Sequence, residues 1–263
     1  MHHTSSVGQE RAEILGVGVS AVDMDRAVEE IEGWIASRRR SYVCVTSVHG
    51  IMECQRSGPL KAIHARAGLV VPDGKPLVWV ARWLGFTNTE QVYGPDLMRR
   101  LTELSADRGY RQFYYGGAAG VPEALRDTLC RQHPGLTVVG TLSPPFRQLT
   151  EEEDAEIVRQ INAAKPDIVW VGLSTPKQER WMSEHAAKLD APVLIGVGAA
   201  FDFLSGRTRQ APLWMQRSAL QWLFRLAVEP RRLWRRYAWI VPGFLWRVSM
   251  QLVRHRLTAR MAR

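Results

Sequence analysis

The sequence predicts an α/β fold in which a parallel sheet is flanked by helices and followed by a helical C-terminal appendage. Two observations predict it. Through roughly the first 200 residues, short apolar runs alternate with amphipathic stretches of helical period, the pattern of a parallel sheet covered on both faces. After about Gly206 the strand signals stop, and Arg-, Trp- and Leu-rich helical sequence follows. We therefore divide the chain into a flexible N-terminus (1–13), an α/β core (14–205) and an appendage (206–263).

The expected elements of the core alternate in order along the chain. Strands are expected at residues 15–20, 42–46, 69–71, 112–115, 137–140, 167–172 and 192–197, and helices at 25–38, 51–67, 122–132, 151–164 and 178–188. Strands that alternate with helices in this way pair in parallel, because each crossover returns the chain to the same end of the sheet. In the appendage, Pro212 and Pro230 are each expected in the first turn of a helix.

Positive charge is concentrated in the appendage. The chain carries a net charge of +9, but residues 205–263 contain thirteen arginines, no lysine and one acidic residue, Glu229, and so sum to +12. Five of the ten tryptophans lie there as well. Arginine and tryptophan at high apolar content favour an anionic membrane surface over nucleic acid as the partner. Packing of the appendage on the core, or on a second copy in a homo-oligomer, is the structural alternative.

No secretory, membrane-spanning or metal-binding segment is expected. The first ten residues are polar, and the longest apolar stretch, 237–246, is interrupted by Pro242 and falls short of the roughly 20 residues that a bilayer requires. The three cysteines form no CxxC pair, so neither a disulfide framework nor a zinc site is expected. These features predict a cytoplasmic protein that lies peripherally on the inner face of the cell membrane.

Four loops follow predicted strands, at the edge where open α/β sheets bind ligands: 46–49, 72–75, 116–120 and 174–178. Gly116 and Gly117 open the third loop and would let the backbone approach a phosphate. Their spacing differs from the GxGxxG pattern, so a purely structural turn explains them equally well.

Polar residues in the other loops have two interpretations each. Asp73 could act as a general base, although an Asp-Gly pair is also a common turn. Lys177 and Gln178 could bind phosphate or sugar hydroxyls, and the same segment has the composition of a helix start. Asp23 and Asp25 form a DxD pattern, which holds divalent ions in some enzymes, but capping of the following helix is the favoured interpretation.

Several motifs occur in an order that resembles the WecG/TagA/CpsF glycosyltransferases, glycosyltransferase family 26. They are Val-Pro-Asp-Gly (71–74), Val-Tyr-Gly-Pro-Asp-Leu-Met (92–98), Tyr-Gly-Gly (115–117), Pro-Lys-Gln-Glu (176–179), Gly-Val-Gly-Ala-Ala-Phe-Asp (196–202), Arg-Gln-Ala-Pro-Leu-Trp-Met-Gln (209–216) and the segment 221–237. The resemblance spans roughly residues 14–237. It implies a Rossmann-like core with a C-terminal appendage.

The resemblance also implies an activity. Members transfer N-acetylmannosamine, its uronic acid or a glucose-type sugar from a UDP-sugar donor to a lipid-linked saccharide acceptor on polyprenyl diphosphate, in the biosynthesis of surface polysaccharides. The chemistry is inverting, and neither a metal nor another cofactor is expected. A nucleotide-sugar-binding scaffold or regulatory protein without catalysis is the alternative function.

The resemblance assigns roles to particular residues. Asp73 matches the proposed general base, Thr46 a threonine near the reacting sugar, and Gln178 a polar residue that lines the site. Asp96 belongs to the 92–98 motif and is assigned to substrate binding with it. Arginines of the appendage are implied to hold the departing diphosphate, which suits the bidentate geometry of guanidinium and phosphate. These arginines are Arg225, Arg232 and Arg235.

Two positions depart from the family pattern. Many members carry an asparagine shortly after the threonine, whereas this chain has His49 in that loop. His49 is therefore a second candidate base or a residue that selects a different sugar. Gln91 stands where many relatives have an arginine that contacts the donor, which leaves the identity of the donor sugar open.

Overall fold

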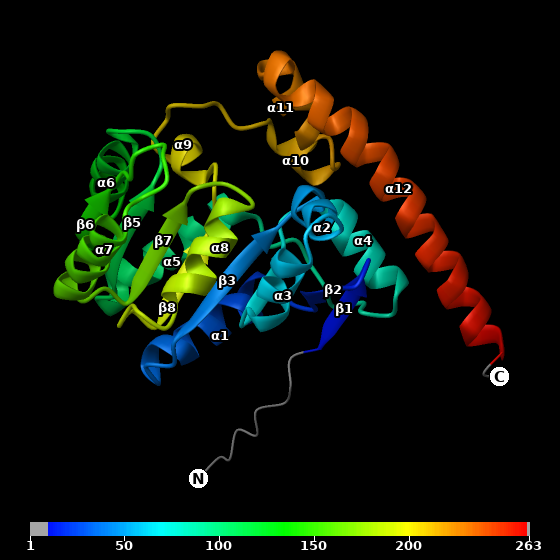
Figure 1. Ribbon diagram of the computed structural model, residues 1–263, viewed down its shortest axis with the longest axis horizontal. Helices are drawn as coiled ribbons and strands as arrows, with labels where there is room; N and C mark the ends of the chain where they lie inside the picture. The colour runs from blue at the N-terminus through cyan, green and yellow to red at the C-terminus, as the bar shows by residue number, and fades with distance from the viewer. Residues whose placement is uncertain (1–9, 262–263) are drawn as a thin grey trace, which may run out of the picture.

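Six parallel strands form the centre of the protein, which confirms the predicted α/β class. A computed structural model describes residues 10–261, apart from the side chains of Arg217, Arg232 and residues 259–261 (Figure 1). The strands lie in the order β4-β3-β8-β7-β5-β6. Their bounds are β3 (Ser41–Thr46), β4 (Leu69–Pro72), β5 (Arg111–Gly116), β6 (Thr137–Leu142), β7 (Ile168–Gly172) and β8 (Val193–Gly196).

Helices cover both faces of this sheet. Alternate residues of β3 show the division, because Val43 and Val45 join one apolar cluster while Tyr42 and Cys44 join the other. The first cluster is completed by α1 (Met24–Ala36), α5 (Gly94–Arg108), α6 (Val121–Gln132) and α9 (Ala200–Leu204). The second is completed by α2 (Val48–Cys54), α3 (Gly58–Arg66), α4 (Lys75–Trp83), α7 (Glu151–Ala164) and α8 (Lys177–His185).

The start of the core differs from its prediction as a flexible segment. Residues from Arg11 form β1 (Arg11–Ile14), which pairs antiparallel with β2 (Val17–Ser20). The strand expected over 15–20 is therefore one arm of a hairpin, and Leu15 and Gly16 form its turn with φ values of 49° and 75°. Because Ala12 and Ile14 are fully buried, the core begins at Arg11 rather than at residue 14. Residues 1–9 of the predicted N-terminus lie outside the described part.

Three helices also differ from expectation. The helix expected over 51–67 is interrupted, because Ser57 caps a new helix, α3, by accepting a hydrogen bond from the Leu60 N–H at 3.3 Å. Helices α4 and α5 stand where no element is expected from the sequence. The signals for α5 are nevertheless present: Pro95 lies in its first turn and Gly109 ends it with a positive φ of 74°.

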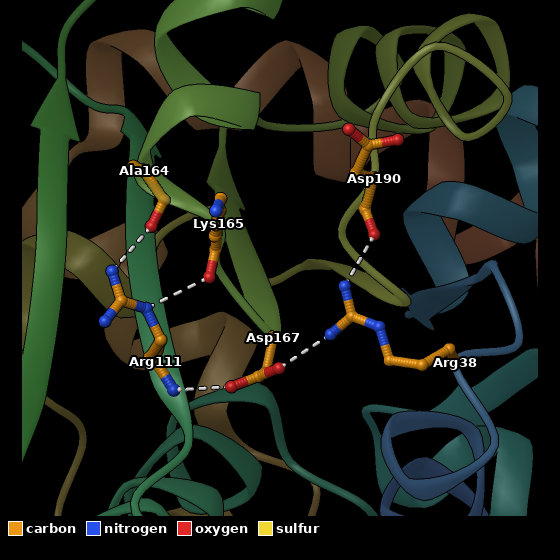
Figure 2. A network of polar contacts seen from close by, with 6 residues as sticks. All are labelled: Arg38, Arg111, Ala164, Lys165, Asp167 and Asp190. Atoms are coloured by element: carbon orange, nitrogen blue, oxygen red, sulfur yellow. Dashed lines mark hydrogen bonds and ion pairs between the residues drawn. The ribbon is translucent and has the colours of Figure 1, made fainter.

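A polar network closes the amino-terminal edge of the sheet (Figure 2). Asp167, just before β7, accepts hydrogen bonds from the Arg111 N–H and the Arg38 guanidinium, both at 2.9 Å. Arg111 in turn donates to the carbonyls of Ala164 and Lys165 at the end of α7. The network therefore ties α1, β5, β7 and α7 together at this edge and leaves the carboxyl edge of the strands for ligands.

The appendage consists of three helices that follow a connection at 205–212. They are α10 (Leu213–Arg217), α11 (Gln221–Val228) and α12 (Pro230–Met261). In Figure 1, α12 runs as one long helix beside α2, α4 and the hairpin. One side of α12 is buried against the core through Ile240, Phe244 and Val248. Gln251 adds polar contacts with the hairpin, accepting from the Leu15 N–H at 2.9 Å and donating to the Glu13 carbonyl.

Within residues 10–261, the apolar stretches of the helices are too short or too charged to cross a bilayer.

A substitution at Gly116 tests how closely β5 and β7 pack at the carboxyl edge of the sheet. A Cβ at this position would lie 2.7 Å from the Gly172 carbonyl carbon, and the φ of 116° is unfavourable for other residues. We expect Gly116→Ala to lower the free energy of unfolding by about 2–4 kcal/mol, as backbone strain and overpacking add. Gly33→Ala is the matched control, because it lies in α1 with no atom within 4 Å of the new methyl. It should be neutral or stabilising by about 0.5–1 kcal/mol. Urea unfolding curves measure both, and equal stability of Gly116→Ala and wild type would contradict the packing argument.

Candidate active site

The carboxyl ends of β3, β4 and β8 converge on Gly94. Thr46 ends β3, and its carbonyl accepts the Asp73 N–H at 2.9 Å, so the two residues predicted for the reaction are direct neighbours. A Cβ on Gly94 would lie 3.3 Å from the Val45 side chain, 3.7 Å from Asp73 Oδ1 and 3.8 Å from the Val197 carbonyl. The predicted base therefore stands at the edge where doubly wound sheets place their ligands.

Asp73 is held by the segment 91–94. The Gly94 N–H donates to Asp73 Oδ1 at 2.9 Å, and Gln91 Nε2 donates to the Asp73 carbonyl at 2.7 Å. The Val92 N–H donates to the Pro72 carbonyl at 2.9 Å. Gln91, which departs from the family pattern, thus has a structural partner in the backbone of the candidate base.

The protonation of Asp73 suits a general base. Burial raises the pKa of Asp73 to about 6, against the opposing effects of the Gly94 N–H and the Arg225 charge. A carboxylate with a pKa near 6 is largely ionised at neutral pH, yet it binds a proton more readily than an exposed aspartate does. The negative charge of Asp96 also raises the pKa of Asp73.

Arg225 brings the appendage to this edge. Its guanidinium carbon lies 6.0 Å from the centre of the Phe203 ring, and its charge lowers the pKa values of Asp73 and His49. Arg235 lies exposed with its guanidinium 5.4 Å from the Trp234 ring. Arg232, the third arginine predicted to hold a diphosphate, lies outside the described side chains.

A cavity of about 380 Å³ lies between α2, the loop before α8 and α12. His49, Thr175, Arg235, Arg236 and Trp239 are among its lining residues. Burial lowers the pKa of His49 to about 4, and the charges of Arg236 and Arg225 act in the same direction. His49 is therefore neutral at pH 7, and the arginines supply the positive charge of a site suited to phosphate groups.

Two arginines that line this cavity were not predicted as site residues, Arg236 and Arg56. Arg236 lies next to Arg235 in the sequence, and only the packing of α12 against α2 shows that it also faces His49. Arg56, at the end of α2, stacks with its guanidinium carbon 5.0 Å from the Trp239 ring. Nothing in the sequence around Arg56 indicates that its side chain stacks on Trp239.

Gln178 and Lys177 have different environments. Gln178 is buried, and its Nε2 donates to Glu179 Oε1 at 3.2 Å, while Gln178 Oε1 has no hydrogen-bond partner among the described residues. Lys177 is exposed. Glu179, not predicted as a site residue, is also buried and accepts from the Thr175 hydroxyl at 2.7 Å. Gln178 therefore lies beneath the loop that lines the cavity.

The glycines and Asp96 are fixed mainly by packing and ion pairing. The Gly117 N–H donates to the Gly172 carbonyl at 3.0 Å, and a Cβ on Gly117 would lie 3.2 Å from Val121. Close packing therefore explains why glycine is required at both positions, and contact of Gly116 and Gly117 with phosphate stays a prediction. Asp96 is exposed and pairs with Arg99 at 2.6 Å.

The DxD pattern has a structural explanation. Asp23 caps α1 by accepting the Arg26 N–H at 2.8 Å, which confirms the favoured interpretation of this residue. Over residues 10–261, His, Cys, Asp and Glu side chains form no group of three or more that could hold a metal ion.

Comparison with known proteins gives the family. The family described as "Glycosyl transferase WecG/TagA/CpsF family" matches residues 12–258. The chain belongs to this family. The resemblance predicted from the motifs is therefore confirmed, and the match extends further into α12 than the motifs do.

Two relatives of this glycosyltransferase share the name N-acetylglucosaminyldiphosphoundecaprenol N-acetyl-beta-D-mannosaminyltransferase. The protein from Bacillus spizizenii (strain ATCC 23059 / NRRL B-14472 / W23) is 29% identical over 184 residues, 70% of this chain and 69% of the relative. The protein from Staphylococcus aureus (strain NCTC 8325 / PS 47) is 23% identical over 242 residues, 91% of this chain and 92% of the relative. The predicted enzyme class, a hexosyltransferase, is confirmed.

The pKa of His49 can be measured without any substrate. We expect the His49 imidazole to titrate near pH 4 in histidine-selective NMR spectra, because burial and two arginines disfavour its protonated form. Removing one of these charges in Arg236→Gln should move the titration to higher pH. Arg254→Gln, an exposed arginine near the end of α12, is the matched control and should leave it unchanged. A His49 titration near its ordinary value of about 6.5 in the wild type would contradict the buried, arginine-facing placement.

Proposed function

We propose that this glycosyltransferase moves a sugar from a UDP-sugar to a saccharide on polyprenyl diphosphate, with inversion and without a metal ion. The observation that carries the proposal is the position of Asp73. It stands at the carboxyl edge of the sheet with a raised pKa and is held by the Gly94 N–H, while the charge of Arg225 from the appendage acts to lower that pKa. A base and a fixed cation are the two groups that such a transfer requires.

The reaction follows from these two groups. Asp73 takes the proton from the acceptor hydroxyl as its oxygen attacks the anomeric carbon of the donor. The bond from that carbon to the β-phosphate oxygen breaks on the opposite face, so the configuration inverts and UDP leaves with the electron pair. Arg225, Arg235 and Arg236 meet the charge on the departing diphosphate, as fixed guanidinium groups stabilise charge that develops in a transition state.

The relatives' names suggest the substrates. Their donor sugar is N-acetylmannosamine and their acceptor is N-acetylglucosaminyldiphosphoundecaprenol. We propose the same donor sugar and acceptor for this chain. Because His49 and Gln91 depart from the family pattern near the donor, UDP-linked uronic acid and glucose-type sugars should be tested as donors as well.

Replacing the base tests the mechanism. We expect Asp73→Asn to retain UDP-sugar binding but to lower turnover at least about 100-fold, the scale of a lost general base. In the wild type, kcat/KM should fall as pH drops through about 6, because protonated Asp73 accepts no proton. His49→Gln should retain this acid limb, since His49 is already neutral above about pH 4. Transfer assays with a UDP-sugar panel, a polyprenyl-diphosphate acceptor and added chelator measure all three.

Contrary outcomes identify the alternatives. Near-normal turnover of Asp73→Asn would refute its role, and loss of the acid limb in His49→Gln would assign the base to His49. Binding of UDP-sugar without product from any acceptor would support the scaffold function. Loss of activity with chelator would refute the metal-independent mechanism.

We also propose that α12 holds the enzyme on an anionic membrane surface. Opposite its buried side, α12 presents an outer stripe of exposed residues, spaced at four, three and four positions, which places them on one helical face. The stripe consists of Trp246, Met250, Val253 and Leu257. The sequence of α12 contains arginines but no aspartate or glutamate, so a second copy packed along it would bring like charges together. Anionic lipid complements both the charge and the apolar stripe.

Helix α4 of the core exposes two tryptophans beside α12. Trp79 and Trp83 of α4 are 52% and 66% exposed, and the guanidinium of Arg256 lies 5.6 Å from the Trp83 ring. Tryptophan prefers the bilayer interface, so these residues widen the proposed contact. On this proposal the enzyme lies peripherally on the cytoplasmic face of the cell membrane.

Vesicle binding tests the outer stripe. We expect Trp246→Gln with Met250→Gln to lower sedimentation with vesicles that contain phosphatidylglycerol at least about tenfold, because two buried apolar side chains are lost from the interface. Phe146→Gln, on an exposed loop away from α12, is the matched control. Unchanged binding of the double variant, or equal binding of the wild type to neutral vesicles, would contradict the proposed surface.

A further inference from the structure

The segment that holds the base also touches the appendage. Gln91, Val92 and Gly94 each donate a hydrogen bond to Asp73 or to the residue before it. Tyr93 lies between them, with its ring buried. Its hydroxyl accepts a hydrogen bond from Gln221 Nε2, which belongs to α11 of the appendage. A contact made by the appendage is therefore one peptide away from the N–H that binds the Asp73 carboxylate.

Few contacts join α11 to the core. It has no fully buried residue, although Trp222, Phe224 and Leu226 are partly buried, and the Arg225 guanidinium lies 6.0 Å from the centre of the Phe203 ring. Trp222 makes an edge contact with Tyr237, but that contact joins α11 to α12 rather than to the sheet. Gln221 and Arg225 are four residues apart and share a helical face. A bond at Gln221 therefore also determines where Arg225 points.

We propose that Tyr93 and Gln221 are positioning residues whose hydrogen bond locks α11 in register with the base, so that Arg225 faces Asp73 only when the appendage is docked. The inference rests on the proposed function and deepens it. It makes the base and its cation a single unit, assembled from two parts of the chain.

The charges around Asp73 give the lock a measurable signature. Arg225 from α11 lowers the pKa of Asp73, while Asp96 from α5 and burial raise it. Burial and the two carboxylates raise the pKa of Tyr93, so its hydroxyl stays protonated and is available as a neutral partner for Gln221. If Arg225 moves away, the opposing effects remain, and the pKa of Asp73 rises.

Three variants and two controls test the lock in the full-length protein. Tyr93→Phe and Gln221→Leu each remove the bond, and the double variant removes both partners. Tyr110→Phe is the matched control for Tyr93→Phe. The Tyr110 hydroxyl donates a hydrogen bond to Glu32 of α1, at the end of α5 that is remote from Gly94. Gln160→Leu is the control for Gln221→Leu, because its amide bonds Glu156 on the exposed face of α7. The readouts are amide hydrogen exchange over residues 221–228 and the pH dependence of kcat/KM.

We expect each single variant to lower kcat about tenfold, the scale of one hydrogen bond in a buried site. The double variant should be no worse than either single, because all three lose the same contact. Exchange over 221–228 should accelerate, and the acid limb should move to higher pH. Both controls should match the wild type in every readout.

Two results would overturn the proposed lock. The first is a Tyr93→Phe variant whose amide exchange over residues 221–228 and whose pH dependence of kcat/KM both match the wild type. The second is a double variant in which the two single losses of kcat multiply. The proposed function fails differently. If the wild type forms no product from any donor, that proposal falls, and the exchange data still decide whether the bond holds α11.

Discussion

The balance between burial and opposing charge at the Asp73 carboxylate is the constraint on which the active site depends. Burial raises the pKa of Asp73, and a protonated acid accepts no proton. The N–H of Gly94 and the charge of Arg225 oppose this effect, and their balance leaves the pKa of Asp73 near 6. The hydrogen bond comes from the core and the positive charge from the appendage, so neither part of the chain alone sets the chemistry of the base.

The core could be predicted because its central strands are buried on both faces. Continuous apolar runs such as 168–171 and 193–196 are typical of central parallel strands, and each strand was placed within two residues of its observed bounds. The hairpin at the N-terminus was not predicted, because its turn uses Leu15 at positive φ where glycine or asparagine would have signalled it. The break between α2 and α3 was missed although Ser57 and Pro59 carry its signals.

The site was predictable where motifs lie at strand ends and not where it depends on packing between distant segments. Thr46 and Asp73 follow two neighbouring strands, so the sequence brings them together by topology. Arg236 and Tyr93 depend on how α11 and α12 lie against the core, which no local spacing reveals. Glu179 is hidden for a different reason, since a glutamate in the first turn of a helix is ordinarily exposed.

The two apolar sides of α12 have a geometric consequence. One side packs on α2 and the hairpin, and the opposite side carries the exposed stripe that begins at Trp246. With lipid on that outer side, the width of a single helix, about 10 Å, would separate α2 and the hairpin from the bilayer surface. The helix would then act as a spacer that fixes the height of the active site above the lipid head groups. An acceptor whose reacting hydroxyl lies closer to the head groups than this, or farther from them, would not reach the Asp73 carboxylate, even if its sugar fitted the site.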